Sequence, residues 1–438
     1  MKFSRNQIII ISAVGVIIIF FALVLLGVIP GLQVQTKKQA QIQLNFWGVG
    51  ESQGVYQPII DQFQSLYAGV QIKYRKLDVG TYENDLINAL AAGTGPDIFM
   101  IRNTWLPKHY NKISPLPKTA MNTATYSGQT GFFPDVVGQD FTSNGTIYAF
   151  PLSVDTMAMI YNKDIFNQSG IALAPTTWTE LQNDIPMMEI SDATGKISRA
   201  GAAIGGTNAS VDNATDLLSL IMLQNGTQMV NKDFTQATFA QSTTNDFSPG
   251  LSALNFYTHF TNPINFDYTW NEGLRNSLDS FAAGSAAVIF GYNSQLVNIK
   301  TKNPLLNFAV APMPTNSSKP VNYANYWGYT VSNKSAHSDM AWDFILFLTT
   351  VQANAQSYLD QTGKPPALNT LITKYQKDSS LGVFAEQALT AKSWPQIDSD
   401  QVDAIFSNMI GYVIRGEQSS QNALTQAQAQ ITQLMGAR

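Results

Sequence analysis

The stretch from Tyr148 to Lys163 places the strongest constraint on how this chain can fold. It is apolar, β-branched and aromatic over most of its length, and no glycine interrupts it, which is typical of extended strands. Pro151 lacks a backbone donor, so it favours a strand edge or the gap between two strands. We interpret the stretch as a crossover in which one strand ends a first lobe and the next begins a second.

Asp155 is the only charged residue between Gly145 and Lys163. A carboxylate in so apolar a run is either solvated in a cleft or held by hydrogen bonds. Two interpretations therefore stay open on the residues alone. Asp155 lies on the floor of a cleft between two lobes, or it is a turn or cap residue of a buried strand.

Length and composition set wider limits. The chain has 438 residues, more than the roughly 250–300 at which a single core stops growing, so we expect two lobes. A net charge of -4 gives no indication of a nucleic-acid partner. The absence of cysteine excludes disulfides, thiolate metal sites, a cysteine nucleophile and a lipoprotein anchor.

The N-terminal segment is long and apolar. Ile8 to Ile29 carries no charge, and Lys2 and Arg5 precede it. About 20 apolar residues span a bilayer, whereas the core of a signal peptide has about 7–15. We predict an uncleaved membrane anchor over residues 1–32, a linker over 33–41, and a single-pass topology with the body on the extracytoplasmic side.

After the linker, strand patterns alternate with helix patterns. Strands are predicted at 42–47, 70–74 and 96–101, and helices at 55–66 and 82–92. The third strand lacks alternation, which indicates burial on both faces. This order predicts βαβ units and a parallel sheet.

Several short segments carry a resemblance through their order and spacing: Phe46-Trp47, Ala91–Ile98, Phe150-Pro151, Asp155-Thr156, Tyr161–Phe166, Gly170-Ile171, Pro175–Leu181, Phe281–Val288, Ala311–Pro314, Ala341–Leu348 and Thr362–Ala367. Together they resemble the extracellular solute-binding proteins of ABC transporters, family 1, the maltose-binding-like sugar-binding proteins. The chain from Leu371 onward matches only as a helical region.

The resemblance implies an α/β, two-lobed periplasmic-binding-protein fold of type II with a hinge crossover, here preceded by a transmembrane helix. The first lobe would hold residues 42–153 and 314–368, and the second 154–313 and 369–438. Such a protein captures a sugar or oligosaccharide between its lobes and delivers it to ABC permease subunits. We expect a monomer without a cofactor, tethered to the cell membrane.

The residues themselves give no catalytic pattern. The three histidines, His109, His259 and His337, are far apart and form no metal motif, and neither a G-x-S-x-G elbow nor a P-loop occurs. We therefore predict no catalytic residue and no metal. A carboxylate pair across a cleft could still hydrolyse glycosides, so a glycoside hydrolase is a minor alternative. The runner-up is a sensor of the same fold that presents a polar solute to a membrane receptor.

Open α/β sheets bind ligands at the carboxyl ends of their strands. Sugars require aromatic faces for stacking and polar groups for their hydroxyls. The strand ends supply both in Trp47, Ser52, Asn103, Trp105, Tyr292, Asn293, Trp327 and Gly328. The resemblance adds Glu51 and, at the crossover, Asp155. For each aromatic residue ordinary core packing is the alternative, and we expect it for Trp178, Trp270 and Trp394.

Overall fold

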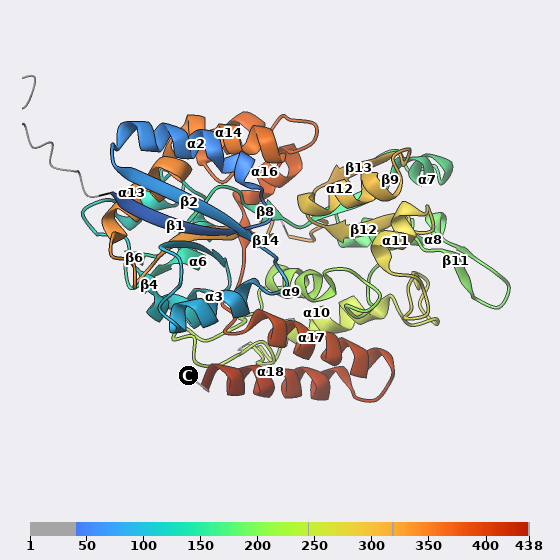
Figure 1. Cartoon of the computed structure of the whole chain (residues 1–438). Coiled ribbons are helices and arrows are strands. Elements are labelled where there is room, and N and C mark those ends of the chain that lie inside the picture. Colours follow the sequence, from blue (N-terminus) through green and yellow to red (C-terminus); the bar gives the residue numbers. More distant parts are fainter. Residues whose placement is uncertain (1–40, 244, 318, 437–438) are drawn as a thin grey trace, which may run out of the picture.

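The computed structural model describes residues 41–243, 245–317 and 319–436 (Figure 1). The predicted anchor over residues 1–32, and all of the predicted linker except residue 41, lie outside this range. Within the described residues, no helix combines the length and the apolar character needed to span a membrane.

A first body is built on a six-stranded sheet in the order β2-β1-β3-β15-β4, with β7 paired to β15. Its strands are β1 (Ile42–Val49), β2 (Val70–Leu77), β3 (Ile98–Arg102), β4 (Ile113–Ser114), β7 (Phe150–Pro151) and β15 (Trp327–Ser332). β1 runs parallel to β2 and β3, whereas β15 is antiparallel to β3. The predicted βαβ units are therefore confirmed, and β3 is buried over its first four residues.

Helices cover both faces of this sheet (Figure 1). On one side lie α2 (Gln53–Leu66), α13 (Ser338–Thr350) and α14 (Gln352–Thr362), and on the other α3 (Tyr82–Ala91) and α6 (Asp135–Phe141). Shorter elements complete the body: α4 (Leu106–His109), η1 (Tyr110–Lys112), α5 (Thr123–Tyr126), β5 (Thr142–Ser143), β6 (Thr146–Ile147), α15 (Asn369–Tyr375) and α16 (Gly382–Ala388).

A second body surrounds the antiparallel sheet β12-β9-β13, made of β9 (Ala158–Asn162), β12 (Val288–Gly291) and β13 (Phe308–Ala311). Its helices are α7 (Lys163–Gln168), α8 (Trp178–Met188), α9 (Ala214–Gln224), α10 (Pro249–His259), α11 (Ser277–Ala282), α12 (Asn293–Lys302), α17 (Ser399–Ile414) and α18 (Ser420–Gly436), with a hairpin β10 (Ile190–Ser191) and β11 (Ile197–Arg199). Thr177 and Glu180 form the capping box that starts α8.

The crossover interpretation is confirmed, because β7 belongs to the first sheet and β9 to the second. The chain passes between the bodies three times, and each passage contributes one strand to a small sheet. This hinge sheet has the order β16-β14-β8, made of β8 (Asp155–Thr156), β14 (Asn322–Asn325) and β16 (Ala391–Lys392). All three passages are thus tied together by backbone hydrogen bonds.

Two hydrophobic cores follow this division. One core draws on residues 44–154 and 324–391, and the other on residues 157–313, Tyr323 and 394–435. Trp178, Trp270 and Trp394 are buried in the second core, as expected. The lobe boundaries at 153, 313 and 368 stay a prediction; Leu371 and Ile372 pack in the first core.

A buried acid joins α6 to the third passage. The Asp140 carboxylate accepts hydrogen bonds from the Tyr326 hydroxyl at 2.7 Å, from Asn103 Nδ2 at 3.2 Å and from the Ser393 hydroxyl. Burial raises the pKa of Asp140 to about 7, although these three donors act to lower it. The surroundings of Asp140 therefore favour the protonated, uncharged form of its carboxyl group.

Because the pKa of Asp140 is higher in the folded than in the unfolded chain, its contribution to stability is complete below the unfolded value of 3.8 and is lost as pH rises through about 7. We expect Asp140→Asn to remove part of the fall in unfolding free energy between about pH 4 and pH 7. Urea unfolding at several pH values measures this. Asp135→Asn, an exposed acid on the same helix, is the control, and an unchanged slope in Asp140→Asn would contradict the assignment.

Candidate ligand-binding cleft

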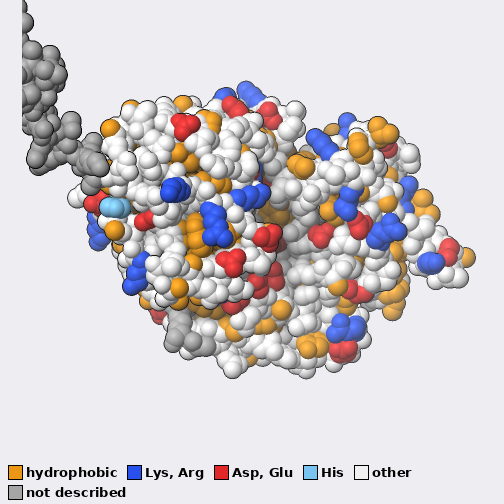
Figure 2. Space-filling model, viewed as in Figure 1, with side chains coloured by type: hydrophobic (Ala, Val, Ile, Leu, Met, Phe, Trp, Pro, Cys, Tyr) orange, Lys and Arg blue, Asp and Glu red, His pale blue; other side chains and the backbone are white. Residues whose placement is uncertain are grey.

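The surface is hollowed between the two bodies (Figure 2). Two cavities lie there and share Asn213 and Asn325 as lining residues. The aromatic compartment, about 460 Å³, is lined by Val49, Gly50, Val79, Met100, Leu152, Ser153, Asp155, Asn213, Tyr292, Ser294, Gln295, Asn325, Tyr326, Trp327, Tyr329, Tyr358 and Lys364. The polar compartment, about 350 Å³, is lined by Arg102, Asn103, Thr104, Asn208, Asp212, Asn213, Thr215, Asp216, Tyr323, Ala324, Asn325, Gln396, Ser399 and Asp403.

Strand ends supply much of this lining, as the sequence predicts. β1 ends at Val49, β3 at Arg102 and β12 at Gly291, directly before Tyr292. The second body adds residues at the starts of α9 and α12, among them Thr215, Asp216, Ser294 and Gln295. The cleft is therefore walled by both bodies.

Asp155 lies in the wall of the aromatic compartment and also caps a helix. Its Oδ1 accepts from the Asn293 backbone N–H at 3.0 Å, and its Oδ2 accepts from the Ser294 N–H at 3.2 Å. Burial raises the pKa of Asp155 to about 7, against the lowering effects of these bonds and of Lys364. Asp155 therefore combines the two roles that the sequence left open, that of a cleft residue and that of a cap residue.

A second acid, Asp216 on α9, was missed by the sequence reasoning. Its Oδ2 accepts from the Tyr292 hydroxyl at 2.6 Å and from Asn325 Nδ2 at 3.4 Å. Burial raises the pKa of Asp216 to about 6, and the charge of Asp403 on α17 adds to the rise. No local motif marks Asp216 or Asp403, because only the docking of α9 and α17 brings them to the cleft.

Arg102 faces these acids from the first body. Its guanidinium lies over the rings of Trp105 and Trp327, 5.6 and 5.4 Å from their centroids. Arg102 Nε is buried and has no hydrogen-bond partner among the described residues. A buried donor without a partner is costly. Arg102 itself lines the polar compartment, where its guanidinium group can donate to a ligand oxygen.

The two tryptophans beside Arg102 differ in access. Trp327 lines the aromatic compartment. Trp105 is only 5% exposed and packs against Tyr82, His109 and Trp327. The structure thus places Trp105 behind Arg102, in the wall and not at its surface.

Of the other predicted residues, Asn103 lines the polar compartment, and its Nδ2 also donates to the Ala324 carbonyl. The Asn293 side chain is half-buried at the start of α12. Glu51 forms an ion pair with Lys364, which lines the aromatic compartment. Tyr292, from the second body, lines the same compartment.

Like Trp105, Glu51 and Asn293, three further predicted residues lie outside both linings. Trp47 packs beneath Arg75, whose guanidinium is 5.1 Å from its ring centroid. Ser52 is the exposed N-cap of α2. A Cβ on Gly328 would meet the Phe141 ring at 2.6 Å, so this glycine allows close packing with α6. Across the described residues, no group of His, Cys, Asp and Glu side chains could hold a metal ion.

Residues 49–355 match the family model of the bacterial extracellular solute-binding proteins. The chain belongs to this family. The match confirms the resemblance carried by the segments between residues 42 and 370, and this family is one of binding proteins, not of enzymes.

Individual relatives are distant in sequence but cover most of the chain. The maltodextrin-binding protein MdxE of Bacillus subtilis is 23% identical over 351 residues, which span 77% of this chain and 76% of the relative. The sugar-binding protein MalE of Xanthomonas citri has a TM-score of 0.73 at 19% identity, covering 90% and 97% of the two chains. A solute-binding protein of Thermotoga lettingae bound with α-D-tagatose has a TM-score of 0.69 at 21% identity, covering 90% and 100%. These likenesses confirm the α/β, two-lobed type II fold.

The position of Trp105 leads to a stability prediction. Trp105→Ala removes a packed ring, so we expect it to lower the unfolding free energy by about 3–5 kcal/mol. Trp47→Ala, at a half-buried ring in the same body, is the matched control and should cost clearly less. Urea denaturation compares the two variants. Wild-type stability in Trp105→Ala would contradict the buried placement.

Proposed function

We propose that this protein captures a sugar or oligosaccharide in the cleft and delivers it to an ABC permease for import. The composition of the cleft wall is the main observation that supports this proposal. Aromatic faces from both bodies adjoin a compartment of amides, acids and one arginine. Sugars combine apolar C–H faces with hydroxyls that both donate and accept, so they match both compartments.

The named ligands of similar proteins support the same class. The names of the relatives described above refer to maltodextrin, to sugar and to tagatose. These range from a single ring to a polymer fragment, so we leave the length of the ligand open. We further propose that residues 1–32 tether the protein to the membrane with the body on the extracytoplasmic side.

Capture would work by closure about the hinge sheet. A ligand that touches both bodies binds the closed arrangement better than the open one, and this difference in affinity drives closure. Trp327 and Tyr292 would contact it from opposite sides. Asp155 would hold the start of α12 in place beside it.

A sugar screen tests this proposal. The melting temperature of the full chain in detergent, measured by thermal shift, should rise with at least one of maltotriose, maltotetraose, mannobiose or tagatose. A ligand that binds only the folded state stabilises that state. Each hit is then measured by calorimetry. If none of a broad panel of neutral sugars binds, the proposal is wrong.

Trp327→Leu keeps apolar packing but loses the flat ring face. A stacked sugar ring contributes on the order of 1 kcal/mol beyond its buried area, and anchor residues contribute about 1–3 kcal/mol. We expect affinity for the bound sugar to fall about tenfold to a hundredfold. Tyr110→Leu is the control, because this exposed ring lies outside both compartments. Equal affinities in the two variants would remove Trp327 from the site.

A further inference from the structure

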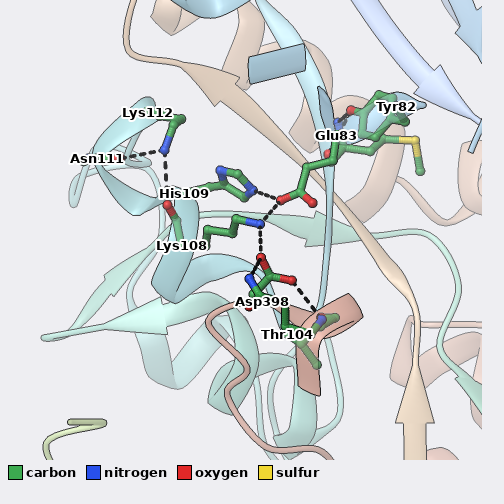
Figure 3. A network of polar contacts seen from close by, with 11 residues as sticks. Tyr82, Glu83, Thr104, Lys108, His109, Asn111, Lys112 and Asp398 are labelled. Atoms are coloured by element: carbon green, nitrogen blue, oxygen red, sulfur yellow. Dashed lines mark hydrogen bonds and ion pairs between the residues drawn. The ribbon is translucent and has the colours of Figure 1, made fainter. Parts of the chain in front are cut away.

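An ion-pair network joins the two bodies behind the polar compartment (Figure 3). Lys108 Nζ lies 2.9 Å from Glu83 Oε1 and 3.1 Å from Asp398 Oδ2. Glu83 is on α3 and Lys108 on α4, in the first body, whereas Asp398 is the N-cap of α17 in the second. We call Glu83, Lys108 and Asp398 the interlobe clamp.

The clamp is distinctive in its placement. Throughout the described part of the chain, the Lys108–Asp398 contact is the only ion pair that links an element of one core to an element of the other. The three side chains are 26%, 19% and 25% exposed for Lys108, Glu83 and Asp398, so solvent screens them only in part. The nearly buried His109 also holds Glu83, with Nε2 at 2.7 Å from the same Oε1.

Beside the interlobe clamp, uncharged residues of the two bodies also contact each other, and they reach the cleft. We call the clamp together with these contacts the junction. Thr104 Oγ1 and Ser399 Oγ are 2.8 Å apart, and the Gln396 N–H donates to the Thr104 carbonyl at 3.4 Å. All three residues line the polar compartment. Asp403, one turn further along α17, lines it too, opposite Arg102.

The charges explain why the junction depends on lysine. Glu83 and Asp398 approach each other around one ammonium group, and without it no cation would link the carboxylate of one body to that of the other. Asp398 also accepts from the Gln401 N–H at 3.1 Å, which fixes the first turn of α17. Moving Asp398 therefore moves the start of the helix that carries Ser399 and Asp403.

We propose that Lys108 is a positioning residue of the cleft, which holds the start of α17 against the first body while the aromatic side opens and closes. Lys108 does not line either compartment, so it acts through Ser399 and Asp403. The effect on affinity rests on the proposed function. The junction would be the fixed side of the cleft, and closure would take place at the aromatic compartment.

Lys108→Met keeps the length of the side chain and removes its charge. We expect the dissociation constant for maltotriose to rise roughly three- to tenfold, because each conformer of α17 other than the clamped one weakens binding. Lys108→Arg should restore most of the affinity. Lys302→Met, which breaks the exposed pair with Asp279 within the second body, should leave it unchanged. Equal affinities of Lys108→Met and Lys302→Met would overturn the proposal.

A covalent bridge gives a stricter test, since the chain has no cysteine of its own. Thr104→Cys and Ser399→Cys, added to Lys108→Met, place two thiols at the 2.8 Å oxygen contact, where a disulfide is geometrically reasonable. Oxidation should tighten maltotriose binding about three- to tenfold relative to the reduced form of the same variant, and reduction should reverse it. If the oxidised form binds more weakly than the reduced form, the junction has to open during binding and the proposal is wrong.

A measurement without ligand tests the role of Lys108 independently of whether the protein binds a sugar. Hydrogen exchange in the full chain should be faster for the amides of residues 399–403 in Lys108→Met, by about threefold or more, with α18 unaffected. Failure of maltotriose and every other sugar to bind the wild type would count against the proposed function only. Unchanged exchange at residues 399–403 would count against the clamp, whatever the sugar does.

Discussion

The hinge sheet is the constraint on which the rest of the structure depends. Three separate passages between the bodies run through β8, β14 and β16, and backbone hydrogen bonds tie them into one unit. Because the passages share one sheet, the bodies can rotate about it without losing register in either large sheet. Asp155 begins one passage and Asn325 ends another, and the two are direct β partners. The floor of the cleft is thus the hinge itself.

Charge burial is the second organising constraint. Asp155, Asp216 and Asp403 all have a pKa raised by burial. Arg102 lies against two indole rings, and no carboxylate of the described residues is within ion-pair distance of it. Such groups are costly when unpaired. Ligand hydroxyls that accept from Arg102 and donate to the acids would relieve this cost. The lining of the cleft in this sense suits a polar, uncharged molecule.

Local patterns were sufficient to predict most of the first body and the crossover. Strand alternation, helical spacing and the Thr177–Glu180 capping box act over a few residues, so the sequence displays them directly. The family resemblance supplied the two-lobed arrangement. The joint sheet of the three passages was not predictable, since β8, β14 and β16 are each two to four residues long.

The site was predicted only in part, for a physical reason. Asp155 and Trp327 begin strands and Tyr292 directly follows one, which made them visible in sequence. Asp216 and Asp403 reach the cleft only through helix docking. Trp105 and Trp327 carry the same sequence signal, a ring beside one end of a strand. In the fold, however, Trp105 is only 5% exposed, between Tyr82, His109 and Trp327, whereas Trp327 lines the aromatic compartment.

The central claim is that the two bodies close on a sugar. The most direct test is the distance between spin labels on cysteines introduced at Leu66 and Val297, exposed positions of α2 and α12 in opposite bodies. Pulsed electron resonance would be recorded with and without each sugar found by the screen. We predict a shift of the distance distribution to a single, changed population when a binding sugar is saturating. An identical distribution in the presence of bound sugar would contradict capture by closure.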